Sequence, residues 1–346
     1  MINNSFKLSA PINVGILTTN RCNLNCKHCM NEANYKNQGE LPNEAIKKVL
    51  DECKKYDVFF VEFNGGEFFV RDDCEELINY ALSLGLKVGI TTNGTLITDE
   101  WIKKYKNKIY IMRISLDSHI EKIHDEFRGS PGAFIKTVDN IKKLVENDYR
   151  VTILHTITKS NAKYIENFIN MIDSLGVHGL HTTIMIPAGN ATNIQNDVLT
   201  PEEHREFLLK YRSIKSKINK DSNLKILEES PQSFLLDERI LDGDIKVKCG
   251  AAFTEIVVTN EGYVLPCAAF IAVATKYKIP ELSINNNSIV DIYRNSNLMN
   301  KVRNINNFKG SCSNCMYLKN CGGGCRAAAD IMTGDVNCAD PMCWMD

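Results

Sequence analysis

The chain has 346 residues, of which 44% are hydrophobic and 24% charged, and its formal net charge is -1. This length suits an α/β domain with a smaller second domain, and the near-neutral charge argues against a nucleic-acid partner, which needs a basic excess. The first ten residues lack an apolar signal core, and no stretch approaches the ~18 apolar residues of a membrane span. We therefore expect a cytoplasmic protein with no membrane or nucleic-acid partner.

Short apolar runs alternate with amphipathic stretches in the first two thirds of the chain. The runs are mostly continuous in apolar character, which is typical of strands buried on both faces of a parallel sheet. Repeated strand–helix units of one handedness curl into a barrel or an open sheet. The six predicted strands are Ile12–Thr18, Val58–Phe63, Lys87–Thr92, Ile109–Leu116, Val151–Ile157 and Leu180–Ile186.

The segments between these strands have the apolar periodicity of helices, and the composition of the chain changes near its C-terminal end. Apolar residues at helical spacing predict one helix face formed by Phe134, Ile135, Val138, Ile141, Leu144 and Val145. From Cys249 onward Gly and Cys dominate, and a hairpin is predicted at Thr254–Thr259 and Tyr263–Leu265. We expect three segments: a barrel over 10–218, a bridge over 219–245 and a cysteine-rich domain over 246–346.

Cysteine usage is the most informative feature of the composition. Of the 13 cysteines, three lie together near the N-terminus and eight lie in the last hundred residues, whereas Cys53 and Cys74 are isolated. Disulfides are disfavoured in a cytosolic protein, so grouped cysteines indicate metal binding. Cys53 lies on the apolar stripe of a predicted helix and Cys74 opens the next one, and we expect both to be structural.

The first cysteine group follows the first predicted strand as Cys22-x3-Cys26-x2-Cys29. Three thiolates can hold three irons of a cubane cluster and leave the fourth iron open to a ligand. The alternative is a three-cysteine zinc site, but structural zinc normally takes four ligands. The one further candidate nearby is His28, between two of the cysteines.

This loop resembles the cluster loop of the radical S-adenosylmethionine (SAM) superfamily, with His28 in the aromatic slot of the motif. The resemblance implies that Cys22, Cys26 and Cys29 bind a 4Fe-4S cluster whose open iron chelates SAM. It also implies that one electron from the cluster cleaves SAM to a 5′-deoxyadenosyl radical, which abstracts a hydrogen atom from the substrate. The protein then holds SAM and substrate in line and keeps water out.

Further family motifs fall at the ends of the next strands. Gly65-Gly66-Glu67 resembles the segment that binds the SAM amino group, with Phe68 in place of the family's Pro. The family's ribose and carboxylate contacts carry over to Ser115 and Arg128, with an ion pair from Arg128 to Asp117 or Asp125 as the alternative. We also expect the Thr92–Thr95 turn to line the SAM site through Asn93.

The C-terminal cysteines resemble those of the SPASM domain, which follows the barrel in one branch of this superfamily and typically holds two auxiliary 4Fe-4S clusters. The spacings are Cys249-x12-Gly262-x4-Cys267 and Cys312-x2-Cys315-x5-Cys321-x3-Cys325, with Cys343 further on. The resemblance assigns Cys312, Cys315, Cys321 and Cys343 to an outer cluster and Cys249, Cys267 and Cys325 to an inner one.

Three questions stay open for this region. The fourth ligand of the inner cluster is undefined, and its iron is either open to substrate or bound by another residue. Cys338 either completes the inner cluster, replaces Cys343 or is a bystander. Two zinc sites are the alternative to iron–sulfur clusters, because Cys-x2-Cys pairs also bind zinc.

The sequence therefore predicts a partial (β/α)6 TIM-like barrel followed by a cysteine-rich SPASM domain. Our leading hypothesis for its activity is oxidative modification of a ribosomally made peptide, with an electron donor such as flavodoxin or ferredoxin. The alternative is an enzyme of cofactor, tetrapyrrole or natural-product biosynthesis, favoured by the roughly eleven residues before the first strand, too few for a leader-binding domain. A non-catalytic electron carrier would not need the Gly-Gly-Glu motif. Sulfatase activators carry an Asp as candidate base at the position of Ala268, so this residue argues against that activity.

Overall fold

The computed structural model describes residues 8–37, 39–218, 222–228 and 249–345. Within them, one nine-stranded sheet has the order β7-β6-β5-β4-β3-β2-β1-β8-β9. Neighbouring strands from β7 to β8 pair in parallel, whereas β8 and β9 pair antiparallel. The strands are β1 (Asn13–Leu17), β2 (Phe60–Asn64), β3 (Lys87–Thr92), β4 (Ile111–Ser115), β5 (Val151–Ile157), β6 (Gly179–Ile184), β7 (Lys225–Glu228), β8 (Glu255–Val258) and β9 (Val264–Leu265).

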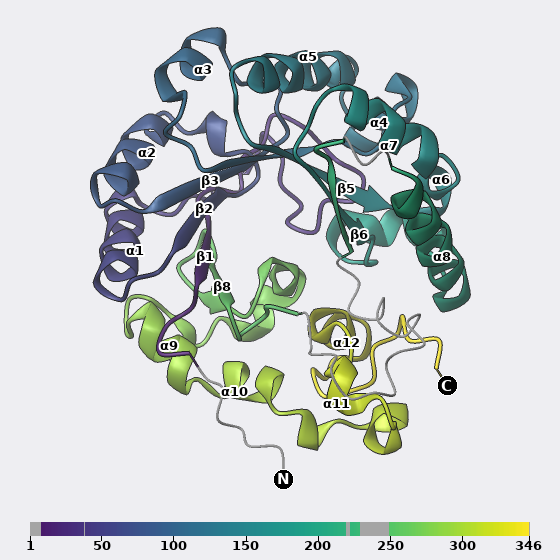
Figure 1. The fold of residues 1–346 in the computed structure, drawn as a ribbon. Coiled ribbons are helices and arrows are strands. Elements are labelled where there is room, and N and C mark those ends of the chain that lie inside the picture. The colour runs from purple at the N-terminus through teal and green to yellow at the C-terminus, as the bar shows by residue number, and fades with distance from the viewer. Residues whose placement is uncertain (1–7, 38, 219–221, 229–248, 346) are drawn as a thin grey trace.

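Helices cover the outer face of the curved sheet, as Figure 1 shows. The C-terminal helices lie across the open side of the curve, opposite the arc formed by the earlier ones. The helices of the arc are α1 (Asn43–Lys55), α2 (Cys74–Ser83), α3 (Asp99–Tyr105), α4 (Glu121–Arg128), α5 (Ala133–Glu146), α6 (Lys159–Ala162), α7 (Ile165–Ser174) and α8 (Pro201–Lys217). Those across the open side are α9 (Ile289–Asn295), α10 (Asn297–Arg303), α11 (Leu318–Cys321) and α12 (Arg326–Thr333).

The predicted partial barrel of six strand–helix units is confirmed, and the structure adds two strands to it. β7 pairs with β6 at one edge and β8 pairs with β1 at the other. β7 lies in the predicted bridge over 219–245, of which 219–221 and 229–245 lie outside the described residues. Since the strands are parallel, their carboxyl ends share one edge of the barrel, where ligands bind in such folds.

The core lies between the sheet and its covering helices. Cys53 on α1 is fully buried in this core, as expected for a structural cysteine, and Cys74 at the start of α2 packs against it. The predicted face of α5 is correct except for Ile135, which is 51% exposed. Because a helix turns by about 100° per residue, Ile135 lies roughly 200° from the buried Thr137. Every helix of the described residues falls short of the length and apolar character needed to cross a bilayer.

The predicted C-terminal hairpin is confirmed as β8 and β9, which turn at Thr259–Tyr263. The sequence did not predict that β8 joins the barrel sheet, where Asn13 of β1 pairs with Glu255. This pairing matters for function, because the cysteine-rich part of the chain and the barrel then share one sheet. Cys249 and Cys267, which flank the hairpin, are thereby held beside the barrel interior.

Candidate active site and cluster-binding cysteines

The loop that follows β1 brings its three cysteines together. Cys22, Cys26 and Cys29 belong to one small cluster of contacting residues, and Cys22 and Cys26 are less than a tenth exposed. Burial raises the pKa of Cys22 to about 12 and that of Cys26 to about 11. Buried thiols in close proximity need a positive charge nearby to ionise, and a metal cluster supplies it. The donor set therefore fits the predicted 4Fe-4S cluster.

The two glycines of the Gly-Gly-Glu motif pack against this loop. The Gly66 N–H donates to the Thr19 carbonyl at 2.7 Å, and the Glu67 N–H donates to the Arg21 carbonyl at 2.9 Å. A Cβ on Gly65 would lie 2.6 Å from the Thr19 carbonyl oxygen, and one on Gly66 would lie 2.2 Å from that of Arg21. The resemblance implies that this segment binds SAM. In the structure its glycines are needed for the close approach of two backbone segments.

Glycines from two further loops approach the cluster loop in the same way. A Cβ on Gly129, at the end of α4, would lie 2.2 Å from the Asn25 carbonyl oxygen. A Cβ on Gly189, in the segment after β6, would lie 2.6 Å from the Cys29 carbonyl oxygen. Loops from the carboxyl ends of β2, β4 and β6 thus enclose the cysteine loop at one edge of the barrel.

Glu67 does not present its carboxylate to an open site. Its side chain is 1% exposed and accepts hydrogen bonds from the Asn93 N–H at 2.8 Å, the Thr92 hydroxyl at 2.8 Å and the Phe69 N–H at 3.1 Å. Burial raises the pKa of Glu67. These bonds tie the end of β2 to the end of β3, and the contact of Glu67 with the SAM amino group stays a prediction.

Asn93 carries this connection on to the cysteine loop. Its side-chain amide donates to the Asn23 side chain at 2.9 Å, and its own oxygen accepts from the Thr95 N–H at 2.9 Å. Asn93, predicted to line the SAM site, is 8% exposed and contacts the loop that carries the cysteines. Glu67 and Asn93 together position that loop.

Arg128 forms the ion pair that was the alternative to a SAM contact. Its Nε lies 2.6 Å from the Asp117 carboxylate, and both side chains are buried. Its Nη1 lies 3.8 Å from the Cys26 sulfur. Burial acts to raise the pKa of Asp117, but Arg128 and the neighbouring His28, His124 and His155 together outweigh it and hold this pKa well below its usual range. Arg128 thus places a positive charge beside one cysteine of the cluster loop.

His28 and Ser115 lie in different environments. The His28 ring stacks on Phe127 with centroids 3.9 Å apart and planes 7° from parallel, and burial lowers its pKa to about 3. A neutral, stacked imidazole fits the aromatic slot in which the sequence placed it. Ser115 is half-buried at the carboxyl end of β4, two residues after Arg113 and therefore on the same face of the strand.

The barrel interior contains a polar group that the motif analysis missed. Both carboxylate oxygens of Glu62 on β2 lie 2.7 Å from Nη1 of Arg113 on β4, and Thr91 on β3 donates to Glu62 at 2.9 Å. Burial, and then the Arg113 charge, lower the pKa of His181 on β6 to about 3. The sequence does contain a signal for Glu62 and Arg113. Each is a single charged residue within an otherwise apolar strand, in Phe-Val-Glu-Phe and Ile-Met-Arg-Ile.

Three C-terminal cysteines gather beside the barrel. The pKa of the Cys267 thiol is raised by burial and by the nearby charges of Glu255, Cys249 and Cys325, so these four side chains are neighbours. Cys325 is also the N-cap of α12, where its sulfur accepts from the Ala328 N–H at 3.4 Å. These are the three thiols that the sequence assigned to the inner cluster.

Four other cysteines line one small cavity farther along the chain. Its walls include Gly323, Gly324 and Asp340 together with Cys312, Cys315, Cys321 and Cys343. Among the described residues, no group of three or more Cys, His, Asp or Glu side chains is arranged to hold a single metal ion. A cubane takes one thiolate at each iron, so its ligands need not surround one ion. The four-thiol cavity fits the predicted outer cluster.

Cys338 lies outside that cavity. Its carbonyl accepts from the Arg326 Nη1 at 2.6 Å, and its N–H donates to the Asp335 carbonyl at 3.0 Å. Its thiol acts electrostatically on Lys309, which does not line the cavity. Cys338 was expected to complete the inner cluster, to replace Cys343 or to bind no cluster. Its position favours the last of these.

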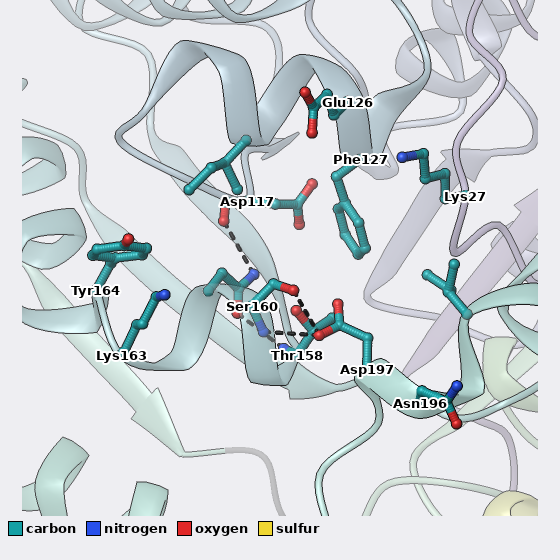
Figure 2. A pocket seen from close by; sticks show the side chains of 13 residues that line it. Lys27, Asp117, Glu126, Phe127, Thr158, Ser160, Lys163, Tyr164, Asn196 and Asp197 are labelled. Atoms are coloured by element: carbon teal, nitrogen blue, oxygen red, sulfur yellow. Dashed lines mark hydrogen bonds between the residues drawn. The ribbon is translucent and has the colours of Figure 1, made fainter.

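A separate cavity of about 570 Å³ opens beside the cysteine loop. Figure 2 shows Lys27 of that loop, Glu126 and Phe127 of α4, and Ser160 facing one another across it. Asp197 accepts two hydrogen bonds from Ser160, at 2.8 and 2.7 Å, and closes one side. The lining includes none of the predicted site residues, so this cavity lies next to the cluster site and not within it.

Comparison with protein families gives two matches. A model described as the Radical SAM superfamily matches residues 16–172. A second model, SPASM, described as an iron-sulfur cluster-binding domain, matches residues 249–316. The first range begins in β1 and includes the Cys22, Cys26 and Cys29 loop, and the second begins at Cys249.

Similar proteins come from two functional groups. The AdoMet-dependent heme synthase of Oleidesulfovibrio alaskensis is 28% identical over 94% of this chain and 85% of its own length. The antilisterial bacteriocin subtilosin biosynthesis protein AlbA of Bacillus subtilis is 30% identical over 75% of this chain and 55% of its own length. Among solved structures, Streptococcus suis SuiB bound to its precursor peptide SuiA has a TM-score of 0.81 at 21% identity, over 98% of this chain and 77% of SuiB.

Proposed function

The chain belongs to the radical SAM superfamily and carries an iron–sulfur-binding SPASM domain, and from this premise we propose that it oxidatively modifies a peptide. The observation that carries the proposal is the arrangement of three cysteine groups around one barrel. The loop with Cys22, Cys26 and Cys29 lies at the carboxyl ends of the strands, and the SPASM thiols lie beside the same barrel through β8. Such an arrangement provides for radical formation and for removal of a second electron in one molecule.

Each group has a role that its surroundings support. Cys22, Cys26 and Cys29 hold the SAM cluster, and the seven SPASM thiols of the two sets described above hold the auxiliary ones. Ser115 contacts SAM directly, whereas Glu67, Asn93 and Arg128 position the cluster loop. Backbone groups of Gly65 and Gly66, and not the Glu67 carboxylate, provide the polar contacts of that motif to SAM.

When bound, SAM and the clusters supply the radical that takes up one hydrogen atom and the acceptor that takes up the second electron, while the second hydrogen leaves as a proton. The chain itself places the SPASM part across the open side of the barrel (Figure 1). An external one-electron donor of the flavodoxin or ferredoxin type supplies the electron that starts each turnover.

The charges in the barrel favour a peptide over a polycarboxylate. Arg113 is already neutralised by Glu62 at 2.7 Å, and Glu255 adds a further carboxylate to the interior. Among the described residues, the interior therefore offers little positive charge for a substrate that carries several carboxylates. The bacteriocin role of AlbA and the peptide complex of SuiB support the same substrate class.

A second candidate is modification of a tetrapyrrole. It is favoured by the heme synthase relative, which this chain matches over more of both lengths than it matches AlbA. Heme precursors carry ring carboxylates, which need basic partners in a binding site. The two candidates therefore differ in the charge that the barrel must complement.

The test is an anaerobic reaction of the reconstituted enzyme with SAM and a strong reductant. One arm contains synthetic precursor peptides and the other an iron tetrapyrrole, and Cys26→Ala serves as the control in both. We expect 5′-deoxyadenosine from the unmodified enzyme, none from Cys26→Ala, and peptide products lighter by two hydrogen atoms. A mass change confined to the tetrapyrrole would overturn the peptide proposal in favour of the second candidate.

A further inference from the structure

Glu255 begins β8 directly after the turn that carries Cys249. The Gly250 carbonyl accepts hydrogen bonds from the Thr254 N–H at 2.9 Å and the Glu255 N–H at 3.1 Å, which folds the chain back on itself. The Glu255 carboxyl carbon lies 3.3 Å from where a Cβ on Gly250 would be. The carboxylate of Glu255 is therefore held against the residue that follows Cys249.

The hairpin brings Glu255 and Cys267 to the same end of its paired segment. Val257 pairs with Leu265 and Val258 with Val264. Glu255 precedes Val257 by two residues and Cys267 follows Leu265 by two residues, so both lie just beyond the last pair. Of the charged groups that act on the Cys249 and Cys267 thiols, Glu255 has the largest effect.

Glu255 is also the carboxylate in this region that lacks a partner. It is half-buried, burial raises its pKa, and its carboxylate makes no hydrogen bond or ion pair with a described residue. Glu62, by contrast, is bound to Arg113. The rival carboxylate, Asp340, accepts from the Cys325 and Met342 N–H groups and lines the outer cavity.

We propose that Glu255 is the fourth protein ligand of the inner auxiliary cluster, completing a set of three thiolates from Cys249, Cys267 and Cys325. A carboxylate oxygen can ligate iron, and Glu255 is the acidic side chain that neighbours both Cys249 and Cys267. All four irons are then bound by the protein, so this cluster transfers electrons and does not bind substrate. The inference rests on the SPASM cluster and holds for either substrate candidate.

The ligand carboxylate also faces the barrel. The charges of Glu62 and Arg113 act on Glu255, and Asn13 of β1 is its parallel neighbour in the sheet. The inner cluster is therefore bound through a side chain that belongs to the barrel sheet itself.

The test uses the full chain with Cys22, Cys26 and Cys29 changed to Ala, so that auxiliary clusters alone contribute to the spectra. In this background we compare Glu255→Ala and the isosteric Glu255→Gln with Glu62→Ala, which removes the other barrel carboxylate. Each protein is oxidised mildly under anaerobic conditions and examined by electron paramagnetic resonance and an iron count.

We expect both Glu255 variants to lose one iron of the inner cluster's four and gain a 3Fe-4S signal that the parent and Glu62→Ala lack. A protein-ligated iron resists this loss, whereas an iron open to solvent is released readily. Glu255→Gln keeps the size of the side chain, so its signal reports ligation and not packing. Spectra and iron content equal to the parent for Glu255→Gln would overturn the proposal, whatever the enzyme's substrate.

Discussion

Gly66 packs so closely on Arg21 that a Cβ at position 66 would lie 2.2 Å from the Arg21 carbonyl oxygen. The second strand's loop thus supports the cysteine loop by direct backbone contact. The hydrogen bond from the Gly66 N–H to the Thr19 carbonyl fixes the same two segments at 2.7 Å. The position of the three cluster thiols therefore depends on the absence of a side chain at residue 66.

Substitution Gly66→Ala should displace the cysteine loop. Overpacking of this kind typically costs about 1–3 kcal/mol, and the backbone atoms it meets cannot rotate away. We expect iron to fall from about twelve atoms per chain to about eight, with SAM cleavage lost. Gly85→Ala is the control: Gly85 has φ +77°, so this substitution strains the backbone, but nothing lies within 4 Å of its Cβ position and the iron should be retained. Full iron content in Gly66→Ala would contradict the role of this contact.

Substitution Glu67→Gln should destabilise the protein and disturb the cluster loop. The amide would place an N–H group against a backbone donor, the Asn93 or the Phe69 N–H, and an unsatisfied buried donor costs about 1–3 kcal/mol. Thermal unfolding and iron content should both fall, whereas the exposed control Glu76→Gln should change neither. Weakened SAM binding with stability and iron unchanged would instead mean that the carboxylate contacts SAM.

Substitution Arg128→Met should leave Asp117 as an uncompensated buried charge. Breaking a buried pair by removing one partner typically costs about 3–5 kcal/mol. The exposed pair Lys122–Glu126, with N–O distance 3.9 Å, provides the control, and Lys122→Met should cost less than about 1 kcal/mol. Denaturant unfolding measures both. If the two substitutions cost the same, the buried ion pair does not stabilise the site.

Cys315 and Cys338 form a matched pair for testing the outer cluster. Cys315 lines the four-thiol cavity and Cys338 does not. Cys315→Ala should reduce iron and sulfide and lower the unfolding temperature, because cluster binding is coupled to folding in a small cysteine-rich domain. Cys338→Ala should keep its iron. Iron loss in Cys338→Ala with none in Cys315→Ala would exchange their roles.

The sequence located the groups of cysteines but not the contacts of the residues around them. Glu67 reads as a ligand contact in its motif, yet its carboxylate accepts three hydrogen bonds within the protein. Arg128 could reach SAM or Asp117 by spacing alone, and the fold brings it to Asp117. Hydrogen-bond partners of buried groups depend on loops far apart in sequence, which spacing does not encode.

The sequence by itself determined the class of chemistry, that of a radical SAM enzyme. Cysteine spacing and strand periodicity are local patterns, so they can be recognised without knowledge of the fold. The sequence also located the three thiol groups, the parallel barrel and the C-terminal hairpin. Only the tertiary structure decided that β8 joins the barrel beside β1, that the Glu255 carboxylate lies against Gly250, and that glycines support the cysteine loop. These relationships join residues up to 242 positions apart, as Asn13 and Glu255 are, and packing of the whole sheet alone brings them together.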